Sequence, residues 1–482
     1  MDPLSVNGRH IVGQSGRRVL LRGTCIGGWM NLENFILGFP GSEEALRCRM
    51  TEAHGERTAA FFFDRLLDYV FAEEDIDFIR SCGATAIRIP INYRHFESDA
   101  APFRYVEKGF DRLAQIVERC SAHGLYVILD LHACQGWQNP DWHSDNASQL
   151  SLLWYDRLYQ DRFVGLWEEL ARRYTGNAAV AGYDLINEPV TNARWGRRAY
   201  HHAPDWQALN ALYRRTVAAI RRIDPDHIII LEGDYYGSRF DGLEPPFSEN
   251  LVYSFHDYRP ACFGAGAGPG MGDREEWGLA NQRESFLSSE AHLFAERHLV
   301  PLFAGEFGAA TSESSEETAF RLRALGDQMG IFDEFGIHWT SWTYKDIGVM
   351  GWVQLLPNTS YLETIRPVTR LKQDLAVDSW MTWLAPTPVK MKVFELADMI
   401  EGALADEAIQ TEEYRALLAQ AVLSGYVALL MQPAYASCFG GLSEDRLDHV
   451  LRSFALSQCR PHGQMIELVK KHLNSGRASV GK

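Results

Sequence analysis

Short apolar runs recur along this chain, and segments with helical spacing separate them. Most of the runs are almost continuous in apolar residues, which is typical of parallel strands buried on both faces. The eight runs lie at Leu20–Gly28, Ala84–Ile91, Tyr126–His132, Val180–Glu188, His227–Asp234, Leu251–Tyr258, Pro301–Gly308 and Ile337–Tyr344. Eight strands that alternate with helices predict an α/β fold, a (β/α)8 TIM barrel.

One intervening segment illustrates the helical spacing. A single face of its predicted helix carries the apolar residues Phe110, Leu113, Ile116, Val117 and Cys120. Gly124 then supplies a stop signal. The alternative to a barrel is a doubly wound open sheet. No Gly-x-Gly-x-x-Gly string follows the first run, so the dinucleotide-binding version of that fold is disfavoured.

Three segments exceed a minimal barrel. A long insertion, 31–75, follows the first run, a Gly-rich loop, 259–280, follows the sixth, and residues 386–482 follow the last. We predict a catalytic barrel over 1–385 that includes the insertion and the loop, and a C-terminal helical extension over 386–482. One helical face of the extension, with Ser443 as its N-cap, carries Leu447, Val450, Leu451 and Phe454. Such a face favours a structural brace over a binding role.

The charge balance and the termini restrict partners and location. A formal net charge of −16, from 47 basic and 63 acidic residues, opposes binding to DNA or RNA. The amino-terminal sequence lacks the pattern of a signal peptide, and no run approaches the ~20 apolar residues of a membrane span. No two of the eight cysteines form a Cys-x-x-Cys motif. We expect a cytoplasmic protein with unpaired thiols; a secreted protein trimmed of its signal would read the same, and the oligomeric state stays open.

Polar residues cluster in and just after the predicted strands. Barrel enzymes place their reactive groups at the C-terminal ends of the strands, where the βα loops form an open cup. Sorting the sequence by this rule gives Arg88, His132, Asn187, Glu188, His256, Tyr258, Glu306 and Trp342. Two of these are single carboxylates at the ends of the fourth and seventh runs. A pair of carboxylates across a sugar ring is the minimum apparatus for cleaving a glycosidic bond.

The strings around these residues resemble the cellulase-like glycoside hydrolase family 5 and its clan of (β/α)8 retaining glycosidases. The matching strings are Ile87-Arg88-Ile89-Pro90, Asp130-Leu131-His132, Asn187-Glu188-Pro189, His256-Asp257-Tyr258, Gly305-Glu306-Phe307-Gly308 and Ser341-Trp342. Each string alone is weak, but six in the correct order at strand ends form a strong joint signal. The resemblance covers about residues 20–346. Cys25 departs from it, because the family often has Asn there.

The resemblance implies that Glu188 is the general acid/base and Glu306 the nucleophile. A retaining enzyme needs its two carboxyl groups ~5–5.5 Å apart, one protonated and one ionised. Arg88 and Tyr258 would keep Glu306 charged, whereas Glu188 would need a less polar site in order to hold its proton.

The resemblance also implies roles for the remaining residues of the set. Asn187 would donate to the sugar 2-hydroxyl, a bond that strengthens in the transition state. His132 and His256 would hold sugar hydroxyls and orient the acid. Trp342 would stack on the apolar face of the sugar.

Each of these residues also has a structural interpretation. Arg88 lies within an apolar strand and needs a carboxylate partner, which allows a purely structural ion pair. Buried histidines and tryptophans are common core residues. Asp130 and His132 point the same way on a strand and admit a zinc site. No further His or Asp cluster falls at the neighbouring strand ends, so we predict no metal and no other cofactor.

The predicted function is therefore that of a retaining β-glycosidase. It would hydrolyse the O-glycosidic bonds of β-linked glucosides, mannosides or short oligosaccharides by double displacement. The insertion and the Gly-rich loop would close one end of the cleft and make the enzyme exo-acting. The alternatives are a transglycosylase that uses the same covalent intermediate, and a catalytically silent carbohydrate-binding barrel.

Overall fold

The computed structural model describes residues 1–192, 203–263, 278–312, 314–377, 387–404, 415 and 418–479 of the chain. Most of the Gly-rich loop predicted at 259–280 lies outside the described residues, and so does the domain boundary predicted after residue 385.

Eight parallel strands close into one barrel, and neighbours around the barrel follow the order of the chain. Each strand overlaps one of the eight apolar runs, which confirms the predicted (β/α)8 barrel. The strands are β3 (Arg22–Cys25), β4 (Ala86–Asn92), β7 (Tyr126–Ala133), β8 (Val180–Asp184), β9 (Ile228–Glu232), β10 (Leu251–His256), β11 (Leu302–Glu306) and β12 (His338–Ser341).

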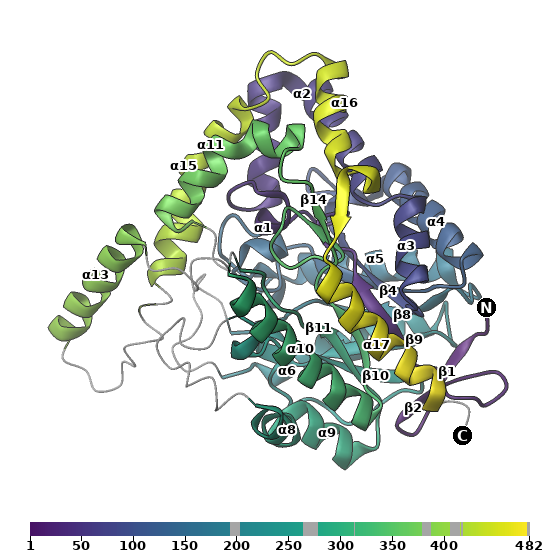
Figure 1. Cartoon of the computed structure of the whole chain (residues 1–482). Coiled ribbons are helices and arrows are strands. Elements are labelled where there is room, and N and C mark those ends of the chain that lie inside the picture. The colour runs from purple at the N-terminus through teal and green to yellow at the C-terminus, as the bar shows by residue number, and fades with distance from the viewer. Residues whose placement is uncertain are drawn as a thin grey trace.

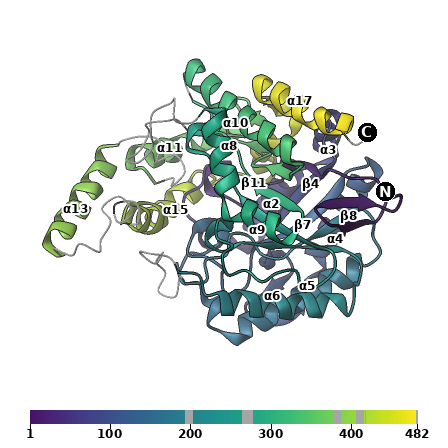
Figure 2. The same cartoon turned by 90° about the horizontal axis from the view of Figure 1, so that it is seen from below.

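Helices surround the barrel, as the two views in Figures 1 and 2 show. They are α3 (Glu73–Ser81), α4 (Glu107–Ala122), α5 (Arg157–Tyr174), α6 (Trp206–Arg221), α8 (Leu279–Ser288), α9 (Glu290–His298) and α10 (Ser315–Phe335). In α4 the predicted apolar face is fully buried, and Gly124 adopts φ 68° just beyond the helix. That left-handed conformation favours glycine and ends the helix as predicted.

An amino-terminal hairpin closes the bottom of the barrel. It consists of β1 (Leu4–Asn7) and β2 (His10–Gly13), which pair antiparallel. Its Leu4 and Ile11 pack in one cluster with residues near the amino-terminal ends of the barrel strands, among them Ile128. Sequence patterns did not predict this hairpin, because four-residue strands are too short for a periodic signal.

The long insertion after β3 is mainly helical. It contains α1 (Asn34–Leu37) and α2 (Glu43–Val70), and α2 has a kink at Gly55, where φ is 77°. The helix α2 packs against two helices of the C-terminal extension, α15 (Ala428–Ser437) and α16 (Glu444–Leu451). In Figure 1, α2 and α16 lie at the top of the molecule and α15 lies at the upper left.

The C-terminal extension packs on the barrel through several contacts. Its strand β15 (Cys459–Pro461) pairs antiparallel with β14 (Val353–Leu355), which follows the last barrel strand. Its last helix, α17 (Gly463–Ser479), packs against α10. Ser443 accepts a hydrogen bond from the backbone of Arg446 and caps α16, as predicted. The apolar face predicted for this region is buried in the main core.

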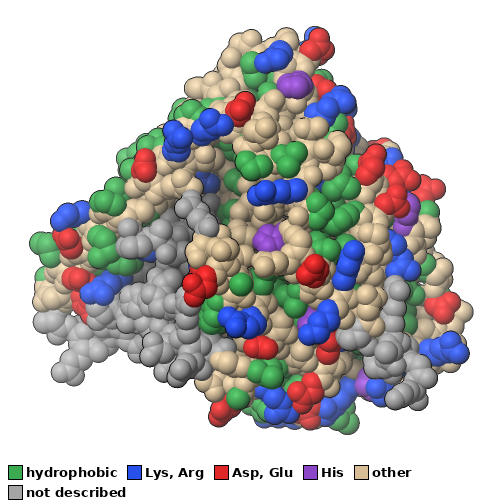
Figure 3. All heavy atoms as spheres, viewed as in Figure 1, with side chains coloured by type: hydrophobic (Ala, Val, Ile, Leu, Met, Phe, Trp, Pro, Cys, Tyr) green, Lys and Arg blue, Asp and Glu red, His purple; other side chains and the backbone are tan. Residues whose placement is uncertain are grey.

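The remaining elements are shorter or lie at the edges. They are β5 (Glu97–Ser98), β6 (Ala101–Tyr105), α7 (Asp234–Gly237), β13 (Lys345–Asp346), α11 (Ser360–Leu375), α13 (Pro388–Leu404) and a π-helix over Gln420–Val427. Acidic and basic side chains are interspersed over the face in Figure 3. Among the described residues, no helix combines the length and apolar character that a bilayer span requires.

Candidate active site

Arg88 lies at the centre of the cup and organises it. Its side chain is fully buried in β4 and donates hydrogen bonds to Asp184 (2.9 Å), Glu306 (2.9 Å) and Asn187 (2.9 Å). Asp130 lies 3.2 Å from the same guanidinium. Although burial disfavours a charged group, these carboxylates hold the pKa of Arg88 well above its ordinary value. Arg88 therefore links the predicted nucleophile to two acidic groups of the barrel interior.

This arrangement predicts a large stability loss when Arg88 is replaced. We expect Arg88→Met to lower the free energy of unfolding by about 3–5 kcal/mol, because it leaves buried carboxylates without their counter-ion. Arg49→Met is the control, since Arg49 pairs with Glu52 at an exposed site and such pairs contribute under about 1 kcal/mol. Urea denaturation of both variants measures the difference. Equal midpoints would contradict the role assigned to the buried guanidinium.

Glu306 ends β11 and is 5% exposed. One of its carboxylate oxygens accepts from Arg88, and the other accepts from the hydroxyl of Tyr258 at 2.8 Å. Burial and the charge of Glu306 raise the pKa of Tyr258 well above its ordinary value, so the phenol keeps the proton that it donates. These two donors hold both oxygens of the carboxylate and fix its orientation in the cup.

Glu188 lies beyond the end of β8, in a strained backbone conformation. Its φ is 47°, which non-glycine residues seldom adopt. Two side chains hold this conformation: Glu232 accepts a hydrogen bond from the Glu188 amide at 3.0 Å, and Asn139 donates to the Glu188 carbonyl at 2.9 Å. Strained residues that are held in this way are concentrated at functional sites.

The surroundings of the Glu188 carboxylate differ from the less polar site that the sequence suggested. Its Oε1 lies 2.7 Å from His256 Nδ1, and its Oε2 lies 3.0 Å from His143 Nε2. Burial alone would raise the pKa of Glu188, but hydrogen bonds from the two imidazoles lower it well below its ordinary value. The two imidazoles therefore compete with Glu188 for the proton of this cluster.

The two carboxylates face each other across the cup. One oxygen of Glu188, one of Glu306 and a ring nitrogen of His256 all lie within 4.8 Å of one another. Retaining glycosidases hold their carboxyl groups ~5–5.5 Å apart, and inverting enzymes hold them farther apart. The same three atoms could ligate a divalent cation. A cation seated there would occupy the space between the two carboxylates.

His132 and Trp342 form the opposite side of the cup. Their rings are parallel, with centroids 5.2 Å apart and an interplanar angle of 10°. His132 Nδ1 lies 2.7 Å from Asp130, and its Nε2 lies 3.2 Å from Glu33 and 3.3 Å from the Asn187 amide. Burial holds the pKa of His132 well below its ordinary value, so the ring is neutral. Trp342 directly follows β12 rather than lying within it.

The charge on His256 predicts a pH-dependent stability. Although burial disfavours the imidazolium, the charges of Glu232 and Glu306 and the hydrogen bond to Glu188 raise the pKa of His256 to about 10. A raised folded-state pKa gives a contribution that is complete below the unfolded value of about 6.5 and is lost as the pH rises through 10. We expect the free energy of unfolding to fall across this window, and to fall less in His256→Asn. Parallel urea curves at pH 6, 8 and 10 measure both slopes, and identical slopes would contradict the assignment.

The structure thus brings together all eight side chains predicted from the sequence, and it adds three that the sequence did not indicate. Glu33 comes from the insertion, His143 from the loop after β7, and Glu232 from the end of β9. Burial and nearby carboxylates raise the pKa of Glu33 well above its ordinary value. Glu232 lies inside the predicted run His227–Asp234, two residues before its end, which was a usable signal; Glu33 and His143 lie in loops without any local pattern.

Comparisons with known proteins identify the family of this chain. The family model "Cellulase (glycosyl hydrolase family 5)" matches residues 58–348. A β-xylosidase from Phanerodontia chrysosporium is 35% identical over 481 residues, which cover 95% of this chain and 96% of that protein. Cellodextrinase A from Ruminococcus flavefaciens is 28% identical over 312 residues, which cover 62% of this chain and 84% of that protein.

A solved structure shares the fold. An endogalactoceramidase superposes with a TM-score of 0.52 at 19% identity and covers 72% of this chain and 75% of its own. The family model spans more than half of the chain, and the β-xylosidase matches along nearly its whole length. This chain therefore belongs to glycosyl hydrolase family 5 and is a glycoside hydrolase.

Proposed function

We propose that this protein is an exo-acting retaining β-glycosidase in which Glu306 is the nucleophile and Glu188 the general acid/base. One observation carries this proposal: a carboxylate oxygen of Glu188 and one of Glu306 lie within 4.8 Å of each other, and a ring nitrogen of His256 lies within the same distance of both. That spacing suits a covalent intermediate and leaves too little room for the water of an inverting enzyme.

The proposed reaction has two displacements. In the first, a Glu306 oxygen attacks the anomeric carbon, the bond from that carbon to the leaving oxygen breaks, and Glu188 gives that oxygen a proton that it receives from the neighbouring imidazoles. In the second, Glu188 takes a proton from water, the water oxygen attacks the anomeric carbon, and the bond to Glu306 breaks. The sugar leaves with its original configuration, and the cluster of Glu188 and its two imidazoles regains its proton.

The other side chains are proposed to prepare and hold the reactants. Arg88 and Tyr258 orient the Glu306 carboxylate for attack through the hydrogen bonds described above. The Asn187 amide is the donor for the sugar 2-hydroxyl, because Arg88 already occupies its carbonyl oxygen. His132 accepts or donates toward sugar hydroxyls, His256 orients Glu188, and Trp342 supplies an apolar surface.

We propose a β-xyloside or β-glucoside as the substrate. The relative that matches almost the whole chain is named a β-xylosidase, and another is named a cellodextrinase. Exo-action is supported by the insertion, which supplies one wall of the cup. There Glu33 lies 3.2 Å from His132, and Glu43 accepts hydrogen bonds from Leu32 and Asn92. We propose that this wall limits the cup to the terminal sugar of a chain.

A panel of aryl β-glycosides tests the activity and the stereochemistry together. We expect turnover of the β-xyloside or the β-glucoside, and proton NMR is expected to show the β-anomer as the first product. A first-formed α-anomer would refute the retaining mechanism. An exo-enzyme should also release single sugars from oligosaccharides without reducing the viscosity of a soluble β-glucan. A rapid loss of viscosity would refute exo-action alone.

A further inference from the structure

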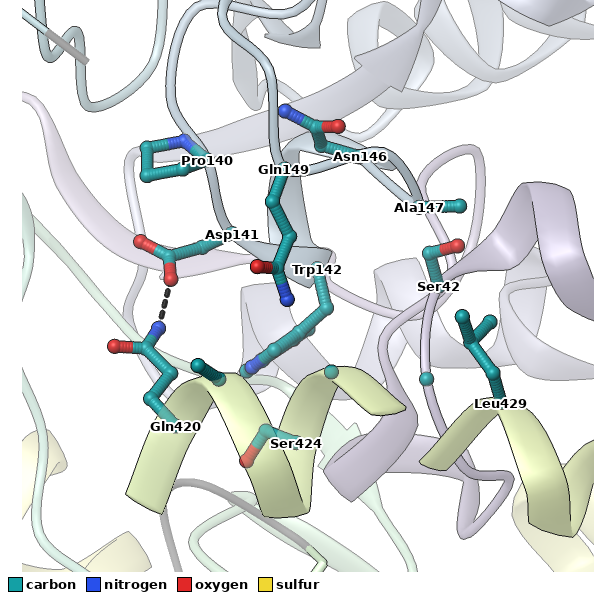
Figure 4. A pocket seen from close by; sticks show the side chains of 13 residues that line it. Ser42, Pro140, Asp141, Trp142, Asn146, Ala147, Gln149, Gln420, Ser424 and Leu429 are labelled. Atoms are coloured by element: carbon teal, nitrogen blue, oxygen red, sulfur yellow. Dashed lines mark hydrogen bonds between the residues drawn. The ribbon is translucent and has the colours of Figure 1, made fainter. Parts of the chain in front are cut away.

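The C-terminal extension reaches the loop that carries His143. A pocket separates the two, and the pocket is lined by loop residues such as Asp141 and Trp142 and by π-helix residues such as Gln420 and Ser424. Figure 4 shows the Gln420 amide pointing across this pocket to the Asp141 carboxylate, and the two are hydrogen-bonded. More than 270 residues of chain separate these partners, so only the folded extension brings them together.

Asp141 anchors the loop through both of its carboxylate oxygens. Oδ1 accepts from Gln420, and Oδ2 accepts from the Tyr236 hydroxyl at 2.5 Å. The backbone of Asp141 is held as well, because its amide donates to Asn139 at 3.0 Å and its carbonyl accepts from Ser144 at 2.8 Å. A 3-10 turn, Trp142–Ser144, begins immediately after this residue. The side chain and the backbone of the residue that precedes the turn are therefore both held in place.

His143 lies in the middle of that turn and contacts the acid/base. Its Nε2 lies 3.0 Å from Glu188 Oε2 and 2.9 Å from the Asn139 amide. Its ring packs edge-on against Tyr236, with centroids 6.3 Å apart. The charged groups that face this imidazole are Glu188, Asp141 and Glu306, and the neutral ring of His132 lies 6.3 Å away. His143 therefore holds one oxygen of Glu188 while His256 holds the other.

We propose that Asp141 and Gln420 are positioning residues for the acid/base: they hold the 142–144 turn so that His143 fixes Glu188 Oε2 in the cup. This inference rests on the proposed acid/base role of Glu188. It gives the C-terminal extension a part in catalysis in addition to its packing on the barrel. A general acid works only within hydrogen-bond reach of the oxygen that it protonates, so a shifted turn slows proton delivery.

The test compares substrates that differ in their need for an acid. A 2,4-dinitrophenyl glycoside leaves without a proton, whereas an alkyl or unactivated phenyl glycoside needs one. We expect Gln420→Glu, which sets a carboxylate against Asp141, and His143→Ala each to lower kcat/KM for the poor leaving group about tenfold. The value for the 2,4-dinitrophenyl glycoside should change less than about twofold. The control is Tyr426→Ala, at a 65% exposed side chain of the same π-helix, and it should change neither value.

A double variant provides a rescue that a merely structural role would not produce. In Asp141→Asn with Gln420→Glu, the donor and acceptor exchange places, and the introduced amide still offers an oxygen to Tyr236. We expect this pair to regain most of the activity on the poor leaving group that Gln420→Glu loses. An equal loss on both substrates in Gln420→Glu, or no loss on either, would overturn the inference. Its failure is separable from that of the proposed function, because Glu188→Ala must still show the leaving-group dependence if only the inference is wrong.

Discussion

Glu306→Ala is expected to reduce kcat/KM by about 10⁴-fold or more on every glycoside, because the enzyme loses the group that attacks the anomeric carbon. The cavity left by the carboxylate can admit a small anion. We therefore expect sodium azide to restore turnover of a 2,4-dinitrophenyl β-glycoside. Azide would attack from the side of the missing carboxylate, so the product should be the α-glycosyl azide. Kinetics with increasing azide and NMR of the product measure both outcomes.

The stereochemistry of this product makes the test decisive. Rescue without formation of a glycosyl azide would indicate a general salt effect rather than a replaced nucleophile. Residual activity near that of the wild type would remove Glu306 from the mechanism. Because Arg88 and Tyr258 both bond to Glu306, the variant also loses buried hydrogen bonds. Its folding should be checked by the urea midpoint, with Glu306→Gln as the more conservative partner.

Glu188→Ala is expected to lower kcat/KM by about 10²–10⁴-fold for substrates with poor leaving groups, because the leaving oxygen then departs without a proton. The effect on 2,4-dinitrophenyl glycosides should be small, since their leaving group needs no acid. With this variant, azide should trap the covalent intermediate and give the β-glycosyl azide. The opposite configurations of the two azide products separate the two carboxylate roles. A uniform slowdown across leaving groups would contradict the acid role.

The same variant should change the pH profile. In the free enzyme, Glu188 forms a cluster with the imidazoles of His143 and His256. Burial disfavours the charged form of each ring, but Glu188 and neighbouring carboxylates raise the pKa of both histidines. The alkaline limb of kcat/KM therefore reports loss of a proton from the cluster rather than from one carboxyl group. We expect activity to fall as the pH rises through this limb in the wild type. In Glu188→Ala the limb should vanish for the activated substrate.

The barrel itself could be predicted from local patterns. Parallel strands that are buried on both faces are almost continuously apolar, and this signal marked all eight strands within a few residues. The strand-end rule then indicated Glu306, which does end β11. It was less accurate for Glu188 and Trp342, which follow their strands in loops. Apolar patterning shows where a strand runs, but it contains little information about the loop conformation beyond it.

The amino-acid sequence by itself determined the closed barrel and the two single carboxylates at or just after the ends of buried strands. Both can be read locally, because the pattern of apolar residues and the residue types at a strand end depend only on neighbouring positions in the chain. Only the tertiary structure decided which side chains surround Glu188. His143, Glu232 and, through Asp141, Gln420 come from separate segments. Their approach turned the expected apolar surroundings of the acid into a charged cluster. The physical reason is that a pKa depends on burial and on charges within a few ångströms in space, and neither can be inferred from spacing along the chain.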